Sequence, residues 1–95
     1  MRKVEKSIEI ISALTHTTGT MVTSYHSCSI WENKANVMLD WYKCLKVNDG
    51  LYKEVFDNFL DVFTYYEDLL IEEANKYPDA KNCIDYYFNK KREVE

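Results

Sequence analysis

The sequence predicts an all-α fold, a small bundle of three or four long antiparallel helices forming a single domain over residues 1–95. Two observations support this fold class. The chain contains only two glycines and one proline, whereas an all-β domain of this size needs many turns. Its apolar residues, which make up 46% of the chain, recur at the three- and four-residue spacing of helices. This apolar content also excludes a disordered protein and is enough to bury a core without metals or disulfides.

The first helix is predicted over residues 3–17. Its inward row consists of Val4, Ile8, Ile11 and Leu14. The same phase continues through the polar residues 15–29, THTTGTMVTSYHSCS. Two interpretations stay open: one long helix weakened or bent near Gly19, or a helix that ends there and is followed by a second short one. We favour the first, with the threonine hydroxyls bonded to carbonyls four residues earlier.

The second helix is predicted to start at Ser29, which forms a capping box with Glu32. It runs to about residue 47, and Asn48–Gly50 ends it because both Asn and Gly tolerate the left-handed conformation. The apolar positions of this helix share one side, and they are Trp31, Ala35, Met38, Leu39, Tyr42 and Leu45.

The third helix, over residues 51–76, has the strongest pattern. Its inward row is Tyr52, Phe56, Phe59, Phe63, Tyr66 and Leu70, widened by Val55, Leu60, Val62, Leu69 and Ile71. Pro78 cannot continue the helix. A short fourth helix restarts at Asp79 and Ala80, and its buried side is predicted to be Cys83, Ile84, Tyr87 and Phe88. The basic residues 90–92 lie in its last turn, where cations stabilise free carbonyls.

Charge is distributed unevenly along the chain. Residues 49–73 contain eight acidic residues and one base, whereas the segments on either side are slightly basic. A simple solvated face is one interpretation, but a solvated helix normally mixes both signs. The alternatives are that basic residues of neighbouring helices offset the acidic surplus, or that the helix presents it to a basic partner. Trp41, Tyr65 and Tyr86 fall outside the inward rows. The predicted partner-binding residues are Glu54, Asp57, Asp61, Asp68, Glu72, Trp41 and Tyr65.

No catalytic, metal or cofactor site is predicted. His16, His26 and Cys28 are metal-capable side chains, but their spacing on a helix keeps them apart, and no CxxC or HExxH motif occurs. The three cysteines are an odd number without close spacing, which excludes a disulfide framework and indicates a reducing, cytoplasmic setting. Neither a signal peptide nor a membrane span is expected.

The first functional hypothesis is a small acidic protein-binding module, a phage- or plasmid-type inhibitor or regulator that docks a basic, nucleic-acid-handling protein. The Asn-, Lys-, Tyr- and Ile-rich composition is typical of small proteins of that origin. The alternative is a homo-oligomeric, for example dimeric, structural or scaffolding protein. A metal-dependent all-α nucleotide hydrolase is third, because Glu67, Glu72 and Glu73 lack the paired-glutamate pattern of such enzymes. Direct nucleic-acid binding is disfavoured by the pI of about 5.2.

Overall fold

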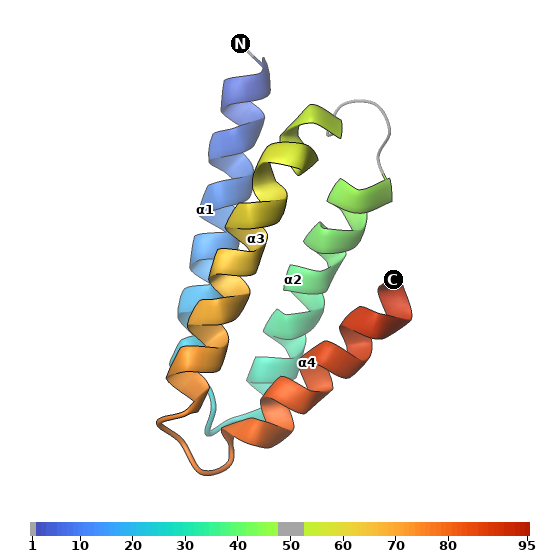
Figure 1. Cartoon of the computed structure of the whole chain (residues 1–95). Helices are drawn as coiled ribbons and strands as arrows, with labels where there is room; N and C mark the ends of the chain where they lie inside the picture. Colours follow the sequence, from blue (N-terminus) through green and yellow to red (C-terminus); the bar gives the residue numbers. More distant parts are fainter. Residues whose placement is uncertain (1, 48–52) are drawn as a thin grey trace.

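The computed structural model describes the backbone of residues 2–47 and 53–95, and the side chains of Glu5, residues 7–46 and residues 60–95. This part of the chain forms four helices, α1 (Arg2–Val22), α2 (Cys28–Val47), α3 (Lys53–Ala74) and α4 (Ala80–Val94) (Figure 1). The predicted all-α bundle is therefore confirmed.

Helices α2 and α3 form the centre of the bundle. α2 runs antiparallel to α1 and α3, so α1 and α3 point the same way (Figure 1). α1 packs on α2 and α3 from one side and α4 packs on them from the other, and the described residues of α1 and α4 do not meet. The largest side chains buried between the helices are Trp31, Tyr87, Phe63, Ile10, Leu14, Met21, Met38, Leu45 and Leu70.

The end of α1 differs from both predicted alternatives. The helix passes through Gly19, whose φ is not positive, and ends at Val22. The hydroxyls of Thr23 and Ser24 then donate to the Thr20 carbonyl at 3.0 and 2.6 Å. Side-chain hydroxyls that donate hydrogen bonds to backbone carbonyls compete with the backbone N–H groups that would continue the helix. Residues 23–27 accordingly form a turn. The stretch is thus helix in its first half and a turn in its second.

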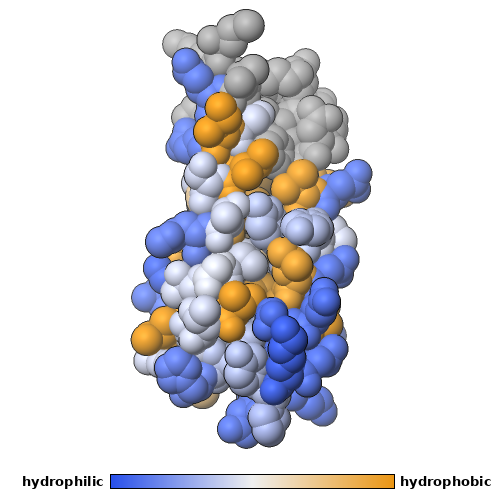
Figure 2. Space-filling view, turned by 90° about the vertical axis from the view of Figure 1, so that its left-hand side faces the viewer, coloured by the Kyte–Doolittle hydropathy of each residue, from blue (hydrophilic) through white to orange (hydrophobic). Residues whose placement is uncertain are grey.

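The row of residues predicted to be buried on α1 differs from the row that is buried in the structure. Ile8 is 60% exposed and Ile11 40% exposed, whereas Ile10 and Leu14 are fully buried. Val4 lies outside the described side chains. The observed row of Ile10, Leu14, Thr17 and Met21 has the same four-three-four spacing and buries larger side chains than the predicted row, which continues into threonines. Figure 2 views the molecule from the α1 side, where apolar side chains interrupt the polar surface.

The boundaries of α2 and α3 differ slightly from the prediction. α2 begins at Cys28, and the Trp31 N–H donates to the Ser27 carbonyl, so Ser29 lies inside the first turn and the predicted capping box is wrong. α3 ends at Ala74. The end signal at residues 48–50 lies outside the described part of the chain.

The predicted core is largely correct where side chains are described. All six apolar positions predicted for α2 are buried, as are Phe63 and Leu70 of α3. Leu60 and Ile71 are exposed instead, because they lie at the edge of the inward row. In α4, Cys83 and Tyr87 are buried, and Ile84 and Phe88 are half-buried. The predicted core positions Tyr52, Val55, Phe56 and Phe59 lie outside the described side chains.

None of the described helices has a stretch that is long and apolar enough to cross a bilayer.

Candidate docking surface on the third helix

Helix α3 has two chemically different sides. Phe63 and Leu70 face the core and are about 1% exposed. The opposite side has a row of exposed residues at intervals of four, three and four positions, the spacing that keeps residues on one side of a helix. This row consists of Asp61, Tyr65, Asp68 and Glu72. We call it the acidic stripe.

Asp61, Asp68 and Glu72, the three carboxylates of the acidic stripe, take part in no ion pair within the described part of the chain. The adjacent Glu73 differs, because it pairs with Lys76 at 2.8 Å. The hydrogen bond from the Lys76 amine to Glu73 raises the pKa of Lys76. The acids of the stripe are therefore free to interact with groups outside the molecule.

Tyr65 gives the acidic stripe an aromatic centre. It is 58% exposed, the most exposed aromatic side chain among those described. Its ring meets the edge of the Tyr66 ring at a centroid distance of 5.5 Å. The Tyr66 hydroxyl is in turn 2.5 Å from the Thr15 hydroxyl of α1. Contacts to a neighbouring helix therefore hold Tyr66 in place, and Tyr66 supports the exposed ring.

Of the other predicted binding residues, two lie outside the described side chains and one lies on another helix. The side chains of Glu54 and Asp57 lie outside those that the structure describes. Trp41 is half-buried on α2 and lines a shallow hollow with Val37, Asp40 and Cys44, to which none of the described side chains of α3 contributes. Trp41 thus belongs to a different surface from Tyr65.

One acid of α3 lies inside the bundle, although its burial was not predicted. Glu67 is 6% exposed. Its carboxylate accepts a hydrogen bond from the Tyr87 hydroxyl and forms an ion pair with Lys91, each at 2.7 Å. Glu67 occupies the inward row between Phe63 and Leu70, and this position was the available signal. A carboxylate placed there must find a partner when the helix packs.

The surroundings of Glu67 join three helices. The Lys91 amine, from α4, lies 4.9 Å from the centre of the Tyr42 ring of α2. The Tyr42 hydroxyl donates to the carboxylate of Glu95 at 3.2 Å. Burial, and then the nearby Glu67 charge, raise the pKa of Tyr87 well above its usual range. This cluster therefore stabilises the attachment of α4.

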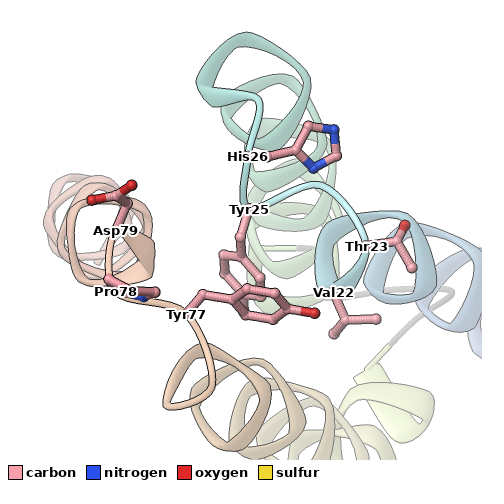
Figure 3. A pocket seen from close by; sticks show the side chains of 7 residues that line it. All are labelled: Val22, Thr23, Tyr25, His26, Tyr77, Pro78 and Asp79. Carbon is pink, nitrogen blue, oxygen red and sulfur yellow. The ribbon is translucent and has the colours of Figure 1, made fainter.

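A small cleft lies where the two turns at the lower end of the bundle meet (Figure 3). Its volume is about 180 Å³, below the range of about 300 Å³ and more that is usual for small-molecule pockets. Tyr77 extends across it beside Tyr25, with ring centroids 5.4 Å apart. His26 and Asp79 lie on opposite sides of the cleft and do not point toward each other (Figure 3). This arrangement offers no acid–base pair.

The metal-capable residues of the sequence are also dispersed. His16, His26 and Cys28 are exposed. Among the described residues, no group of three or more His, Cys, Asp or Glu side chains is arranged to hold a metal ion. Cys28, Cys44 and Cys83 are all free thiols, and burial raises the pKa of Cys83.

Helix α3 thus presents negative charge and an exposed aromatic ring on the same side. Comparison of the chain with protein-family models, with curated proteins and with solved structures finds no match.

Proposed function

We propose that the protein is a binding module whose acidic stripe docks a basic surface of another protein, as an inhibitor or regulator would. The observation on which this rests is the row of three exposed carboxylates around Tyr65, none of which is paired within the described part of the chain. A basic surface of this kind is typical of proteins that handle nucleic acids, and covering it would block that activity.

The chemistry of the stripe suits arginine or lysine side chains. An exposed tyrosine ring attracts a cation placed over its face. Asp61 lies four residues before Tyr65 and Asp68 three residues after it, so both acids are one helical turn from the ring. A guanidinium group stacked on the ring could therefore reach a carboxylate on either side. Arginine and tyrosine are also common among the residues that dominate binding energy at interfaces.

The proposal can be tested with a fluorescent arginine-rich peptide and the full chain. Neutralising the stripe with Asp61→Asn, Asp68→Asn and Glu72→Gln should weaken binding and reduce its dependence on salt, because long-range attraction is screened within about 8–10 Å at physiological ionic strength. Tyr65→Ala should weaken binding with little change in the salt dependence. Nuclear magnetic resonance should show the largest shifts at the stripe.

A matched control separates the stripe from net charge. Asp79→Asn, Asp85→Asn and Glu93→Gln change the net charge equally but alter exposed residues of α4 and the turn before it. This control should bind the peptide more tightly than the stripe variant. Equal losses in the two triple variants would mean that the peptide responds to overall charge alone, and the proposal would then fail.

Self-association, the alternative hypothesis, depends on other residues. Apolar side chains are exposed on the outside of α2, where Ile30 is 47% and Val37 37% exposed. These residues lie on a different helix from the acidic stripe. Docking of a basic partner and pairing of two copies are therefore compatible.

A further inference from the structure

Helix α2 has a second row of residues suited to helix packing. The row follows intervals of four, three, four and three residues, as in the seam of a coiled coil. It consists of Ile30, Lys34, Val37, Trp41 and Cys44, and we call it the outer seam. The buried row of α2 has the same spacing one residue later, about 100° around the helix. α2 therefore offers one side to the core of the bundle and a second to its surroundings.

The described part of the chain covers the outer seam only in part. Ile30 and Val37 are exposed, and Lys34, Trp41 and Cys44 are half-buried. Val37, Trp41 and Cys44 line a shallow, mostly apolar hollow together with Asp40. Exposed valine and isoleucine at coiled-coil spacing are costly to leave in water and are stabilised by a packed helix.

Val37 lies midway between the two ends of the outer seam, and also midway between Lys34 and Asp40. Ile30 and Cys44 each lie seven residues from Val37, and Lys34 and Asp40 each lie three residues from it. If two copies of α2 meet antiparallel at Val37, Ile30 reaches the level of the partner's Cys44, and Lys34 reaches the level of the partner's Asp40. A twofold axis forms each of these contacts twice, as in the isologous interfaces of homodimers.

Lys34 of the outer seam and Asp40, which flanks the seam, carry complementary charges in this arrangement. Neither Lys34 nor Asp40 forms an ion pair in the described part of the chain. Across the axis, each Lys34 amine gains the partner's Asp40 carboxylate and the face of the partner's Trp41, which favours a cation. A parallel pair would instead place Lys34 against Lys34. The complementarity therefore selects an antiparallel second copy of the same chain.

We propose that two copies of this protein form a dimer through the outer seam of α2, antiparallel and centred on Val37. The acidic stripe belongs to α3 and takes no part in the contact. The dimer is therefore independent of the proposed function. A dimer that also has the proposed function presents two acidic stripes.

The first test is the mass of the full chain in solution by analytical ultracentrifugation over a range of concentrations. We expect a dimer of twice the 11.3 kDa chain mass. Val37→Asp should weaken association by roughly 100-fold, because it buries two unpaired carboxylates at the axis. Circular dichroism should show an unchanged helix content, since Val37 is exposed in the single copy.

A matched variant on α1 locates the interface. Ile8 is more exposed than Val37, and Ile8→Asp introduces the same charge outside the outer seam. It should leave the dimer intact. A monomeric native chain, or a dimer that is lost with Ile8→Asp and kept with Val37→Asp, would overturn the proposal.

The register is tested by crosslinking. In a chain with Cys28→Ser, the change Ile30→Cys places a thiol opposite the partner's Cys44. A short thiol-reactive crosslinker should then join position 30 of one copy to position 44 of the other, as identified by peptide mass spectrometry. Links from 30 to 30 and from 44 to 44 would show a parallel pair and contradict the antiparallel register.

Discussion

Glu67 and Asp68 are neighbours in the sequence, yet their side chains lie in different surroundings on α3. The Glu67 carboxylate is buried, 2.7 Å from both the Tyr87 hydroxyl and the Lys91 amine. Asp68 is exposed and forms no ion pair within the described residues. A rotation of 100° about the helix axis separates a carboxylate that holds two helices together from one that is available to a partner.

This difference shows that a count of acidic residues overstates a binding surface. Residues 49–73 have eight acids, but Glu67 is neutralised inside the bundle and Glu73 is paired with Lys76. What remains for docking is the subset on the outer side of α3. Position on the helix, rather than net charge, decides which acids are structural.

The largest effect should come from the inner side of α3. Phe63→Ala removes a fully packed ring beside Tyr42 and should lower the free energy of unfolding by about 3–5 kcal/mol. Tyr65→Ala, two residues away on the outer side, should change it by less than about 1 kcal/mol. Urea unfolding measures both. Similar losses in the two variants would mean that the sides of α3 are assigned wrongly.

The pair of neighbouring acids provides a direct test of the comparison. Glu67→Gln keeps the size of the side chain but leaves Lys91 without its counter-charge, and should cost about 2–3 kcal/mol. Asp68→Asn should change stability by no more than about 0.5 kcal/mol. Urea midpoints at neutral pH compare them. A near-neutral Glu67→Gln would show that the pair with Lys91 contributes little to holding α4.

Much of the fold could be predicted because the inward rows of α2, α3 and α4 consist of large apolar residues at regular spacing. Trp31, Met38, Phe63 and Tyr87 are all buried as expected. Glu67 occupies one of these rows, but its partner Lys91 lies 24 positions away in a basic group that was assigned to the end of its own helix. Pairing across helices depends on tertiary packing, and a single sequence does not reveal it.

Helix α1 was harder to predict because two rows compete on it. The rows that start at Ile8 and Ile10 have similar spacing, and Leu14 is compatible with both. Packing against both α2 and α3 selects the row with Ile10 and Met21. The acidic stripe was predictable from spacing, whereas the separation of Trp41 from Tyr65 follows from how α2 and α3 pack.

Buried tyrosines should make the protein sensitive to alkaline pH. Burial raises the pKa of Tyr25, whose hydroxyl donates to the Leu70 carbonyl at 2.6 Å. The folded state therefore holds this proton more tightly than the unfolded state does. The resulting stability is complete below about pH 10 and is lost as pH rises further, by about 1.4 kcal/mol per pH unit.

Tyr25→Phe tests this pH dependence through the slope of stability against pH. The variant is expected to be less stable at neutral pH, since it loses the bond to Leu70. Above about pH 10 its urea midpoint should fall less steeply than that of the native chain. Lysine titration affects both proteins equally, so parallel slopes would mean that the Tyr25 proton is not held more tightly in the folded state.

The smallest effect concerns the outer side of α1, where intrinsic helix propensity rather than packing should decide stability. Gly19 lies within the helix with no positive φ, and a Cβ added there would have no neighbouring atom within 4 Å. Gly19→Ala should therefore stabilise the protein by about 0.5–1 kcal/mol, because alanine restricts the unfolded chain and favours the helix. Thermal unfolding should show a raised Tm.

The matched change Ala35→Gly, at a buried position of α2, should destabilise the protein by at least as much. A lower Tm for Gly19→Ala would indicate that the chain needs glycine's freedom at this position, and that α1 does not continue to Val22 in solution.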